Sequence, residues 1–502
     1  MSSYPVRKVF LPLTVALVLS GCSLAPKYQR PEAPIPAQYP DYPGLSATDQ
    51  TKGPVASKVD VAADLGWKEF FRDPRLRELI AISLENNRDM RIAVQRVVAA
   101  RAQYGIAQSD RWPTLGIGAQ GTIQKAPKSV SGSDKSVTRQ YQAGLGMTAF
   151  ELDFFGRLKS LSEAAYQDYL ATDQARRTVH INLIAQVAEA YMRLRAAQAQ
   201  YALVQKTLVS YQQSYDLVKS RYDAGVASAL DLNQAQSQLN SAQADLQSTR
   251  RTEAQAANAL LLLLGVSSMP AEPKGAPFDR DQLLSAVPVG LPSALLERRP
   301  DVIEAEHELR AANANIGAAR AAFFPDISLT GLLGFASDQL GGLFSAGNHF
   351  WSVSPSVQIP FLSGTVSGNL ELAKANKKIA VSEYEKTVQT AFREVADTLA
   401  GEATYSQQLD ALRAQQKAAF QTLDISQMRY DTGVDNFLQV QTAEVGLYTV
   451  QNSILQTGLD SLLNRIELYQ ALGGGWLPDS AVASAAGAPA QETADAPVKA
   501  AQ

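Results

Sequence analysis

Histidine, cysteine and acidic side chains come first, because they supply most nucleophilic, proton-transfer and metal-binding chemistry in proteins. The three histidines, His180, His307 and His349, lie far apart along the chain. Glu308 follows His307, but no second histidine stands at the helical spacing of a zinc-protease motif. The sequence has no Walker motif for nucleotide phosphates, and its six methionines are too few to favour a methionine-lined copper or silver path. We therefore expect no catalytic centre, no cofactor and no metal site, and the chain is not expected to be an enzyme.

Cys22 is the single cysteine, so it has no partner for a disulfide within the chain. A basic pair, Arg7 and Lys8, precedes an apolar run at 9–19 that is too short to span a bilayer. The Leu-Ser-Gly-Cys sequence that ends at Cys22 resembles the bacterial lipobox, whose cysteine becomes the lipidated first residue of the mature protein. Acyl chains such as palmitate would anchor it through buried CH₂ groups, and Ser23 fits the outer membrane. The alternative is a buried free thiol.

Charge and hydropathy exclude two other classes of protein. The chain has 46 basic and 49 acidic residues, so it shows no excess for nucleic-acid binding. After residue 22 no stretch has 18 consecutive apolar residues, so the mature chain is expected to have no transmembrane helix.

The hexapeptide Arg-Tyr-Asp-x-Gly-Val occurs twice, at 221–226 and, 208 residues later, at 429–434. The runs 157–224 and 226–264 around the first copy contain neither Gly nor Pro, so each is free to form one helix. At ~1.5 Å per residue the first helix would reach roughly 100 Å. The glycine of each copy then ends one helix in the αL conformation and reverses the chain into the next.

Two other stretches change from helical period to period two. Apolar residues alternate with glycine or polar residues at about 113–153 and again at about 325–362. This pattern predicts two β-hairpins, whose strands of ~10 residues are long enough to cross a bilayer obliquely.

The second half of the chain repeats the first, which gives the domain organisation. Gly401, Gly446 and Gly458 interrupt the second pair of long helices, so that pair is expected to bend more easily. We predict the following segments: a signal peptide at 1–21; a lipidated Pro-rich arm at 22–66; a first repeat at 67–264, with helices, the β-hairpin at about 113–153 and long helices at 157–224 and 226–264; a linker with short helices at 265–300; a second repeat at 301–473, with a helix, the β-hairpin at about 325–362 and long helices at 366–432 and 435–472; and a disordered tail at 474–502.

The fold class follows: mixed α+β, predominantly α, in two tandem repeats, each with a two-stranded membrane hairpin and a long helical hairpin. Unpaired backbone groups in lipid cost several kcal/mol each, and four strands are too few to close a barrel, for which about eight are the usual minimum. Strands in a bilayer would therefore form a barrel shared between chains, with eight strands in a dimer or twelve in a trimer. The alternative is a four-stranded sheet in a soluble domain.

With these features the chain resembles the outer-membrane factors typified by TolC, and within them the OprM-like lipoproteins of multidrug efflux pumps. The resemblance implies a homotrimer whose twelve-stranded outer-membrane barrel continues into a periplasmic α-helical barrel closed at its tip. It also implies two partners, a periplasmic membrane-fusion adaptor and an inner-membrane proton-driven (RND-type) transporter. The residues that carry it are Gly21 to Pro26, Tyr28 to Pro31, Phe70 to Pro74 within Trp67 to Asn87, Glu297 to Asp301, and the two Arg-Tyr-Asp-x-Gly-Val turns.

The resemblance further implies a periplasmic gate just after the two turns. Asp231 matches an acidic gate residue of the first hairpin, and Leu438 matches a leucine that narrows the pore in OprM-like members. Thr442 stands where those members have a second aspartate, and Tyr430 matches a tyrosine that links neighbouring helices. Without the resemblance, Asp231 is equally well interpreted as a solvated helix N-cap.

The turns themselves are the expected adaptor-docking tips. The residues assigned to them are Arg221, Gly225, Val226, Arg429, Gly433 and Val434.

Three functional hypotheses follow. The first is a passive duct that exports drugs and other small toxic compounds to the exterior, lipid-anchored in the outer membrane. The second keeps the duct but changes the cargo to metal ions or secreted proteins. The third is a structural coiled-coil lipoprotein that does not conduct.

Overall fold

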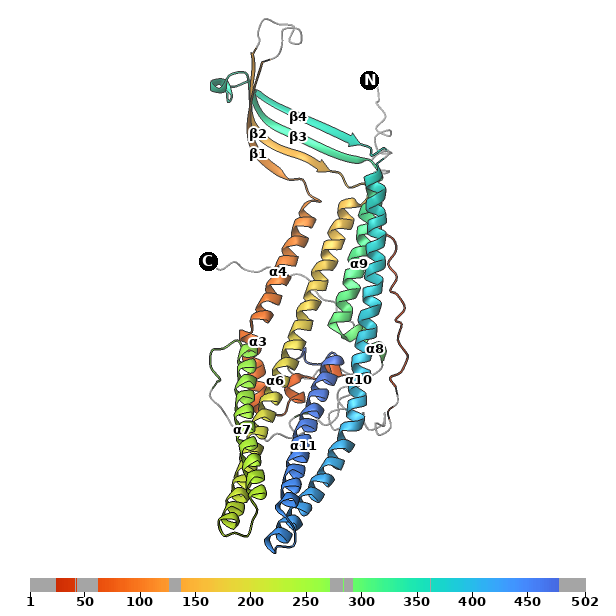
Figure 1. The fold of residues 1–502 in the computed structure, drawn as a ribbon. Coiled ribbons are helices and arrows are strands. Elements are labelled where there is room, and N and C mark those ends of the chain that lie inside the picture. Colours follow the sequence, from red (N-terminus) through yellow and green to blue (C-terminus); the bar gives the residue numbers. More distant parts are fainter. Residues whose placement is uncertain are drawn as a thin grey trace. The chain divides into compact units, whose positions relative to one another are not determined.

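The computed structural model describes residues 24–40, 42, 62–125, 137–270, 283, 292–361 and 363–477 (Figure 1). The predicted signal peptide and the lipidation site Cys22 lie outside these ranges. The described chain divides into two compact units. Unit 1 comprises residues 1–34, 92–176 and 300–389, and unit 2 comprises 35–91, 177–299 and 390–502.

Unit 1 contains one antiparallel sheet with the order β1-β2-β3-β4. The two hairpins therefore join through β2 and β3, where Gly144 pairs with Gly334. A Cβ on Gly334 would lie 2.2 Å from the carbonyl oxygen of Ala143, so this close crossing requires glycine. The strands are β1 (Leu115–Lys125), β2 (Val137–Glu151), β3 (Asp326–Ser337) and β4 (His349–Gln358).

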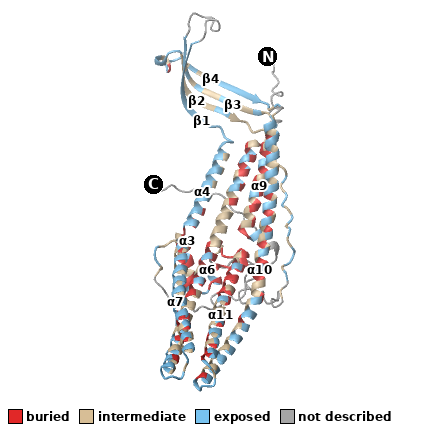
Figure 2. Ribbon diagram, viewed as in Figure 1, coloured by how far each residue is buried: buried red, intermediate tan, exposed pale blue. Residues whose placement is uncertain are grey.

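The sheet is open on both faces in the single chain. Every residue of β1 is exposed, and β4 has no buried residue (Figure 2). Large apolar side chains stand out from these strands, with Ile117 at 89 % exposure and Trp351 at 73 %. The single chain thus leaves both faces of the sheet, and the outer edges of β1 and β4, without a covering element among the described residues.

Unit 1 also contains α9 (Pro300–Ala321), the 3₁₀ turn η4 (Leu340–Gly342), most of α4 (Arg88–Ser109) and the first parts of α6 (Arg157–Asp223) and α10 (Gly364–Asp431). Small side chains bring α6 and α9 together, as Ala164 packs on Ala311 and Ala314. The arm at 24–40 has neither helix nor strand. A Cβ on Gly317 would lie 2.8 Å from the Cβ of Ala25, so glycine makes room for the arm on α9.

Unit 2 is helical, and its core contains apolar residues of α6 that recur at helical spacing. Ile184, Val187 and Tyr191, then Val204 and Val218, are all buried on α6. Besides the later parts of α6 and α10, its elements are η2 (Ala62–Asp64), α2 (Trp67–Phe70), α3 (Pro74–Asn86), α7 (Ala229–Leu264), α8 (Pro292–Arg298) and α11 (Phe437–Ala471). The predicted fold class, mainly helical with two strand pairs in two tandem repeats, is confirmed.

Two predicted helix starts are corrected. The helix expected from residue 226 begins at Ala229, and the one expected from 435 begins at Phe437. In each case the residues between glycine and helix form the remainder of the reversal, with Ser228 and Asn436 as N-caps in extended conformation.

Gly401 has a different role from the predicted one. A Cβ at this position would lie 2.1 Å from Oδ1 of Asn464, so Gly401 forms a notch on α10 for a side chain of α11. Asn464 also donates to the carbonyl oxygen of Thr398 at 2.9 Å, and Arg465 forms an ion pair with Glu402 at 2.8 Å in which both side chains are largely buried. This glycine therefore fixes the packing of the second helical hairpin instead of loosening it.

The start of the tail is also corrected. Residues 474–477 belong to the predicted disordered tail 474–502, but they are packed within unit 2, while 478–502 lie outside the described residues. Gly474 accommodates the ring of Tyr469, and Trp476 lies under the guanidinium of Arg177, 5.0 Å from the ring centroid. No helix within the described ranges is both long enough and apolar enough to cross a membrane.

Candidate functional site at the helical turns

The first and second hairpins, α6/α7 and α10/α11, reverse the chain in the same way. The amide N–H of Val226 donates to the carbonyl of Arg221 at 2.8 Å, and that of Val434 donates to the carbonyl of Arg429 at 2.9 Å. The intervening glycines have φ of 77° and 74°, so the predicted αL reversal is confirmed at both. A Cβ on either glycine would meet nothing within 4 Å; it is the positive φ that favours glycine here.

The first turn is closed by a capping box. The hydroxyl of Ser228 accepts from the amide of Asp231 at 3.1 Å, and the carboxylate of Asp231 accepts from the Ser228 amide at 3.2 Å. Asp231 is therefore the third helical residue of α7 and not its N-cap, which corrects the alternative interpretation. Its negative charge also lies at the positive end of the helix dipole.

The second turn lacks this capping box and contains an ion pair instead. Asn436 makes no capping bond with its side chain, and Gln439 stands 208 residues after Asp231. Arg429 instead pairs within its own turn with Asp435, Nε to Oδ2, at 2.5 Å. The first turn has Ala227 at the position of Asp435, so Arg221 has no such partner in its own turn.

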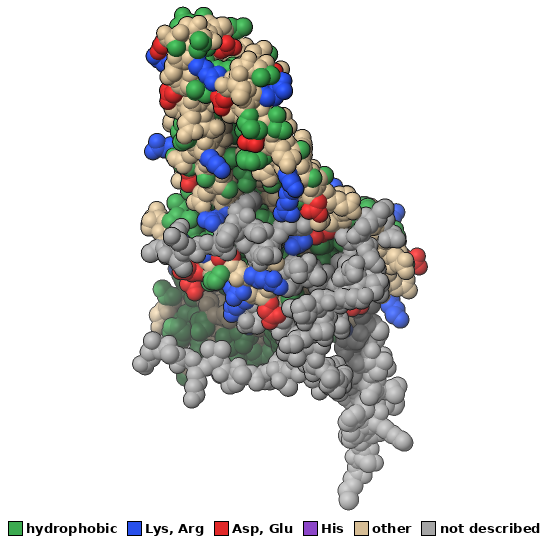
Figure 3. Space-filling model, turned by 90° about the horizontal axis from the view of Figure 1, so that it is seen from below, with side chains coloured by type: hydrophobic (Ala, Val, Ile, Leu, Met, Phe, Trp, Pro, Cys, Tyr) green, Lys and Arg blue, Asp and Glu red, His purple; other side chains and the backbone are tan. Residues whose placement is uncertain are grey.

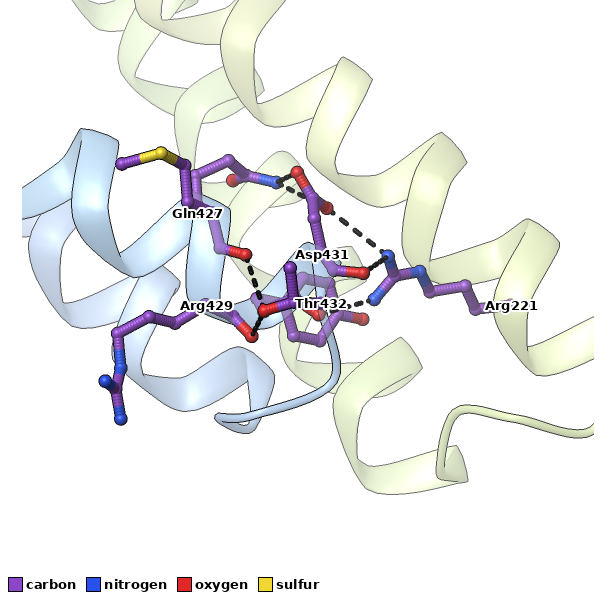
Figure 4. A network of polar contacts seen from close by, with 7 residues as sticks. Arg221, Gln427, Arg429, Asp431 and Thr432 are labelled. Atoms are coloured by element: carbon purple, nitrogen blue, oxygen red, sulfur yellow. Dashed lines mark hydrogen bonds and ion pairs between the residues drawn. The ribbon is translucent and has the colours of Figure 1, made fainter.

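Arg221 reaches from the first hairpin to the second (Figure 4). Its guanidinium donates to the carbonyl oxygens of Tyr430 at 3.0 Å and of Asp431 at 3.3 Å, and to the Asp431 carboxylate at 3.3 Å. It also lies 4.4 Å from the ring centroid of Tyr430, a cation–π distance. Gln427 donates to the same carboxylate at 3.3 Å. In Figure 4 the side chain of Arg429 points away from this network. One arginine of the repeated pair thus binds the partner hairpin and the other stays local.

Tyr430 lies beneath that arginine in the contact between the hairpins. Tyr430 is 6 % exposed, and its ring packs edge-on against Phe437, with centroids 5.6 Å apart. Val218 of α6 and Ala235 of α7 belong to the same buried cluster. Burial raises the pKa of the Tyr430 hydroxyl above its usual value. Of the predicted gate residues, this one is a core residue of the hairpin contact.

Leu438 and Thr442 lie one helical turn apart on α11, and both are exposed in the single chain. The Thr442 hydroxyl donates to the Leu438 carbonyl at 2.7 Å, so it serves its own helix. At the tips, Val226 and Val434 are 76 % and 62 % exposed. Among the predicted residues, Leu438, Val226 and Val434 are therefore exposed apolar side chains, whereas Tyr430 and Arg221 make buried or half-buried contacts between the hairpins.

The face seen in Figure 3 shows basic, acidic and apolar side chains interspersed over the coloured surface, with no large area of one sign. Within the described residues, no three His, Cys, Asp or Glu side chains gather as metal ligands.

Sequence reasoning missed Glu444, a carboxylate that is only 5 % exposed on α11. The sequence contained a signal for this residue, because Glu444 follows Phe437 and Val440 at helical spacing and so places a charge on an apolar face. Arg221 was assigned to the tip but not to a contact between the hairpins. The sequence did contain a sign of this contact. Ala227 stands where the second turn has Asp435, so Arg221 has no acidic residue at the position that pairs with Arg429.

A second polar cluster holds the arm in unit 1. The Glu306 carboxylate pairs with Arg30 of the arm and with Arg310 of α9, and it accepts from the hydroxyl of Tyr28 at 3.2 Å. Burial by itself would raise the pKa of Glu306, but hydrogen bonds from the two arginines outweigh it and hold the pKa below its usual value.

Comparison with known proteins gives consistent matches over almost the whole chain. The family model for outer membrane efflux protein matches residues 79–266 and 291–474. The antibiotic efflux pump outer membrane protein ArpC of Pseudomonas putida is 44 % identical over 475 residues, which cover 94 % of this chain and 96 % of that protein. The solvent efflux pump outer membrane protein SrpC of Pseudomonas putida is 46 % identical over 473 residues, covering 93 % and 98 %. The open state of the MtrE outer membrane channel of Neisseria gonorrhoeae has a TM-score of 0.80 and 37 % identity, covering 92 % of this chain and 100 % of that chain.

Proposed function

The chain belongs to the outer membrane efflux protein family, and from that membership we propose that it is the outer-membrane duct of a tripartite efflux pump. Relatives are named for the efflux of antibiotics and of solvents, so the proposed cargo is small toxic organic compounds. The duct is passive, because the sequence has no nucleotide-binding motif and a partner must then supply the energy. The observation that carries the proposal is the repeat itself, a strand pair followed by a long helical hairpin, twice in one chain.

The sheet supports an assembly of three chains. Among the described residues β1 and β4 pair on one side only, and an open sheet edge is not tolerated in lipid. Pairing β4 of one copy with β1 of the next would close the edges, and three copies would give a twelve-stranded barrel. The exposed apolar side chains of Ile117 and Trp351 would then face lipid, the lumen of the barrel or a neighbouring chain.

The remaining parts of the proposal concern anchoring and partners. Acylation of Cys22 would anchor each chain at the outer membrane. The exposed tip residues Val226 and Val434 would bind a periplasmic adaptor, which connects the duct to an inner-membrane proton-driven transporter. Asp231, Leu438 and Thr442 would border the closed pore, while Tyr430 and Arg221 would hold the hairpins together behind it.

The test combines conductance with phenotype. Purified protein reconstituted in planar lipid bilayers should form pores, and cross-linking should give trimers. A strain that lacks the gene should become more sensitive to antibiotics and solvents, with unchanged metal tolerance and secreted proteins. Absence of pores together with monomers on cross-linking would reject the duct. A change only in metal tolerance or in the secreted proteins would keep the duct and reject the cargo.

A further inference from the structure

Glu444 of α11 is bound by both helices of the first hairpin. Its Oε1 accepts from the hydroxyl of Ser214 on α6 at 2.7 Å, and its Oε2 accepts from the side-chain amide of Gln238 on α7 at 3.0 Å. The residue is 5 % exposed. These three residues, called the Glu444 site below, thus connect the second hairpin to each helix of the first.

The two partners of this carboxylate are neutral. Among the described residues no Lys, Arg or His contributes to its protonation equilibrium, and burial raises its pKa against the smaller, opposing effect of the two hydrogen bonds. The neighbouring Tyr211 of α6 is acted on by Glu444, by Tyr448 of α11 and by Asp245 of α7, and none of these groups is cationic. An ionised carboxylate that loses water without gaining a counter-charge destabilises the packed state.

The amide of Gln238 adds a second observation. Its Oε1 is buried and has no hydrogen-bond donor among the described residues. A protonated Glu444 carries one O–H donor, and rotation of the amide would present Oε1 to it. The neutral acid would therefore keep a hydrogen bond to Gln238 without burying a charge.

The equivalent positions in the other half of the repeat do not reproduce the Glu444 site. At an offset of 208 residues, Glu444 corresponds to Gln236, Ser214 to Thr422 and Gln238 to Gly446. Gln236 is half-buried and donates to Asn240 of its own helix at 3.0 Å. A carboxylate thus bridges the two hairpins of one chain, and the equivalent positions carry none.

We propose that the Glu444 site is a proton-sensitive contact that holds the second hairpin closed against the first, with Glu444 as a positioning residue for the gate. This rests on the proposed function, in which the hairpins must separate at their tips for cargo to leave. The packed state favours the protonated acid and a separated state favours the ionised one, since ionisation is easier in water. Closure is therefore strongest in acid and weakens as the pH rises through the raised pKa.

The experiment measures leak conductance of the full-length protein in planar bilayers from about pH 5 to about pH 8, a range in which a carboxyl of raised pKa ionises. The wild type should show a several-fold rise with pH. Glu444→Gln, which is neutral throughout and retains an acceptor and a donor, should stay at the low acid level. Glu444→Leu, which leaves both partners unsatisfied, should be high at every pH. The exposed control Asp245→Asn should follow the wild type.

Ser214→Ala provides a milder variant that keeps the carboxylate. Because the Ser214 hydrogen bond lowers the pKa of Glu444, its loss should move the conductance midpoint to higher pH. A wild-type profile in both Glu444→Gln and Ser214→Ala would overturn the proposal.

A separate readout distinguishes this proposal from the duct itself. Spin labels on Ala224→Cys and Thr432→Cys, exposed residues of the two turns, should report a longer distance at high pH that Glu444→Gln abolishes. If the wild type forms no pores, the duct fails, and the label distances alone decide on the Glu444 site. A distance independent of pH in the wild type would overturn the Glu444 site even if the pores are present.

Discussion

Arg221→Ala should release the two hairpins from each other at their turns. The exposed pair with Asp431, whose side chain is 48 % exposed, contributes at most about 1 kcal/mol. The charged hydrogen bond to the Tyr430 carbonyl adds about 1.5 kcal/mol, and the cation–π contact adds about 0.5–1 kcal/mol. Ordering the long arginine side chain offsets up to about 1.5–2 kcal/mol of this sum. A net loss of about 1–2 kcal/mol per chain corresponds to roughly a 5- to 30-fold shift toward separated hairpins.

The repeat provides the matched control. Arg429→Ala removes the same side chain from the same hexapeptide, but Arg429 pairs only with Asp435 of its own turn in the contacts seen here. Leak conductance in planar bilayers should therefore rise with Arg221→Ala and stay near the wild-type value with Arg429→Ala. Arg221→Lys should be intermediate, since an ammonium keeps the charge and loses the planar fork. Equal conductance of the two alanine variants would refute the distinction between the two turns.

Three further predictions concern the gate and the arm. Leu438→Ala should raise leak conductance more than Asp231→Ala, because the leucine side chain is expected to occupy the pore, whereas the aspartate change removes one half of the capping box, a loss of about 1 kcal/mol; the reverse order would contradict the assignment. Asp231→Ala should also lower the thermal unfolding midpoint slightly, and an unchanged midpoint would argue against the capping box as a stabilising contact. Glu306→Gln should remove the carboxylate of α9 that pairs with Arg30 of the arm and so loosen the arm, which limited proteolysis of residues 24–40 would detect. Since the pKa of Glu306 is lowered, its contribution is complete above about pH 4.3 and is lost as the pH falls through the lowered value. Wild-type protection of the arm should therefore fail only in acid, and equal cleavage of both proteins at neutral pH would contradict the role of this carboxylate.

Local chemistry explains why so much of the fold was predictable. Period-two alternation located both strand pairs, the absence of Gly and Pro located the long helices of the first repeat, and the repeat itself located those of the second. A glycine with an obligatory positive φ located each reversal. Each of these signals depends only on residues close together in the chain, so a single sequence is enough to detect it.

The contacts between the hairpins could not be predicted in the same way. Arg221 and Tyr430 are 209 residues apart, and no local rule pairs them. Gly401 was misinterpreted because a glycine that loosens a helix and one that admits Asn464 look the same in a sequence. Glu444 could have been flagged as a charge on an apolar face, but its partners Ser214 and Gln238 are ordinary polar residues of two other helices.

Length is the last property that the repeat constrains. Helices α7 and α11 have 36 and 35 residues, and Arg221 meets Tyr430 only because the two turns end level with each other. An insertion of one heptad in a single hairpin would shift its turn by roughly 10 Å and separate that pair. Viable changes in the length of these hairpins are therefore expected to have arisen as compensated insertions or deletions in both halves of the gene, in steps that preserve the side of the helix facing the partner.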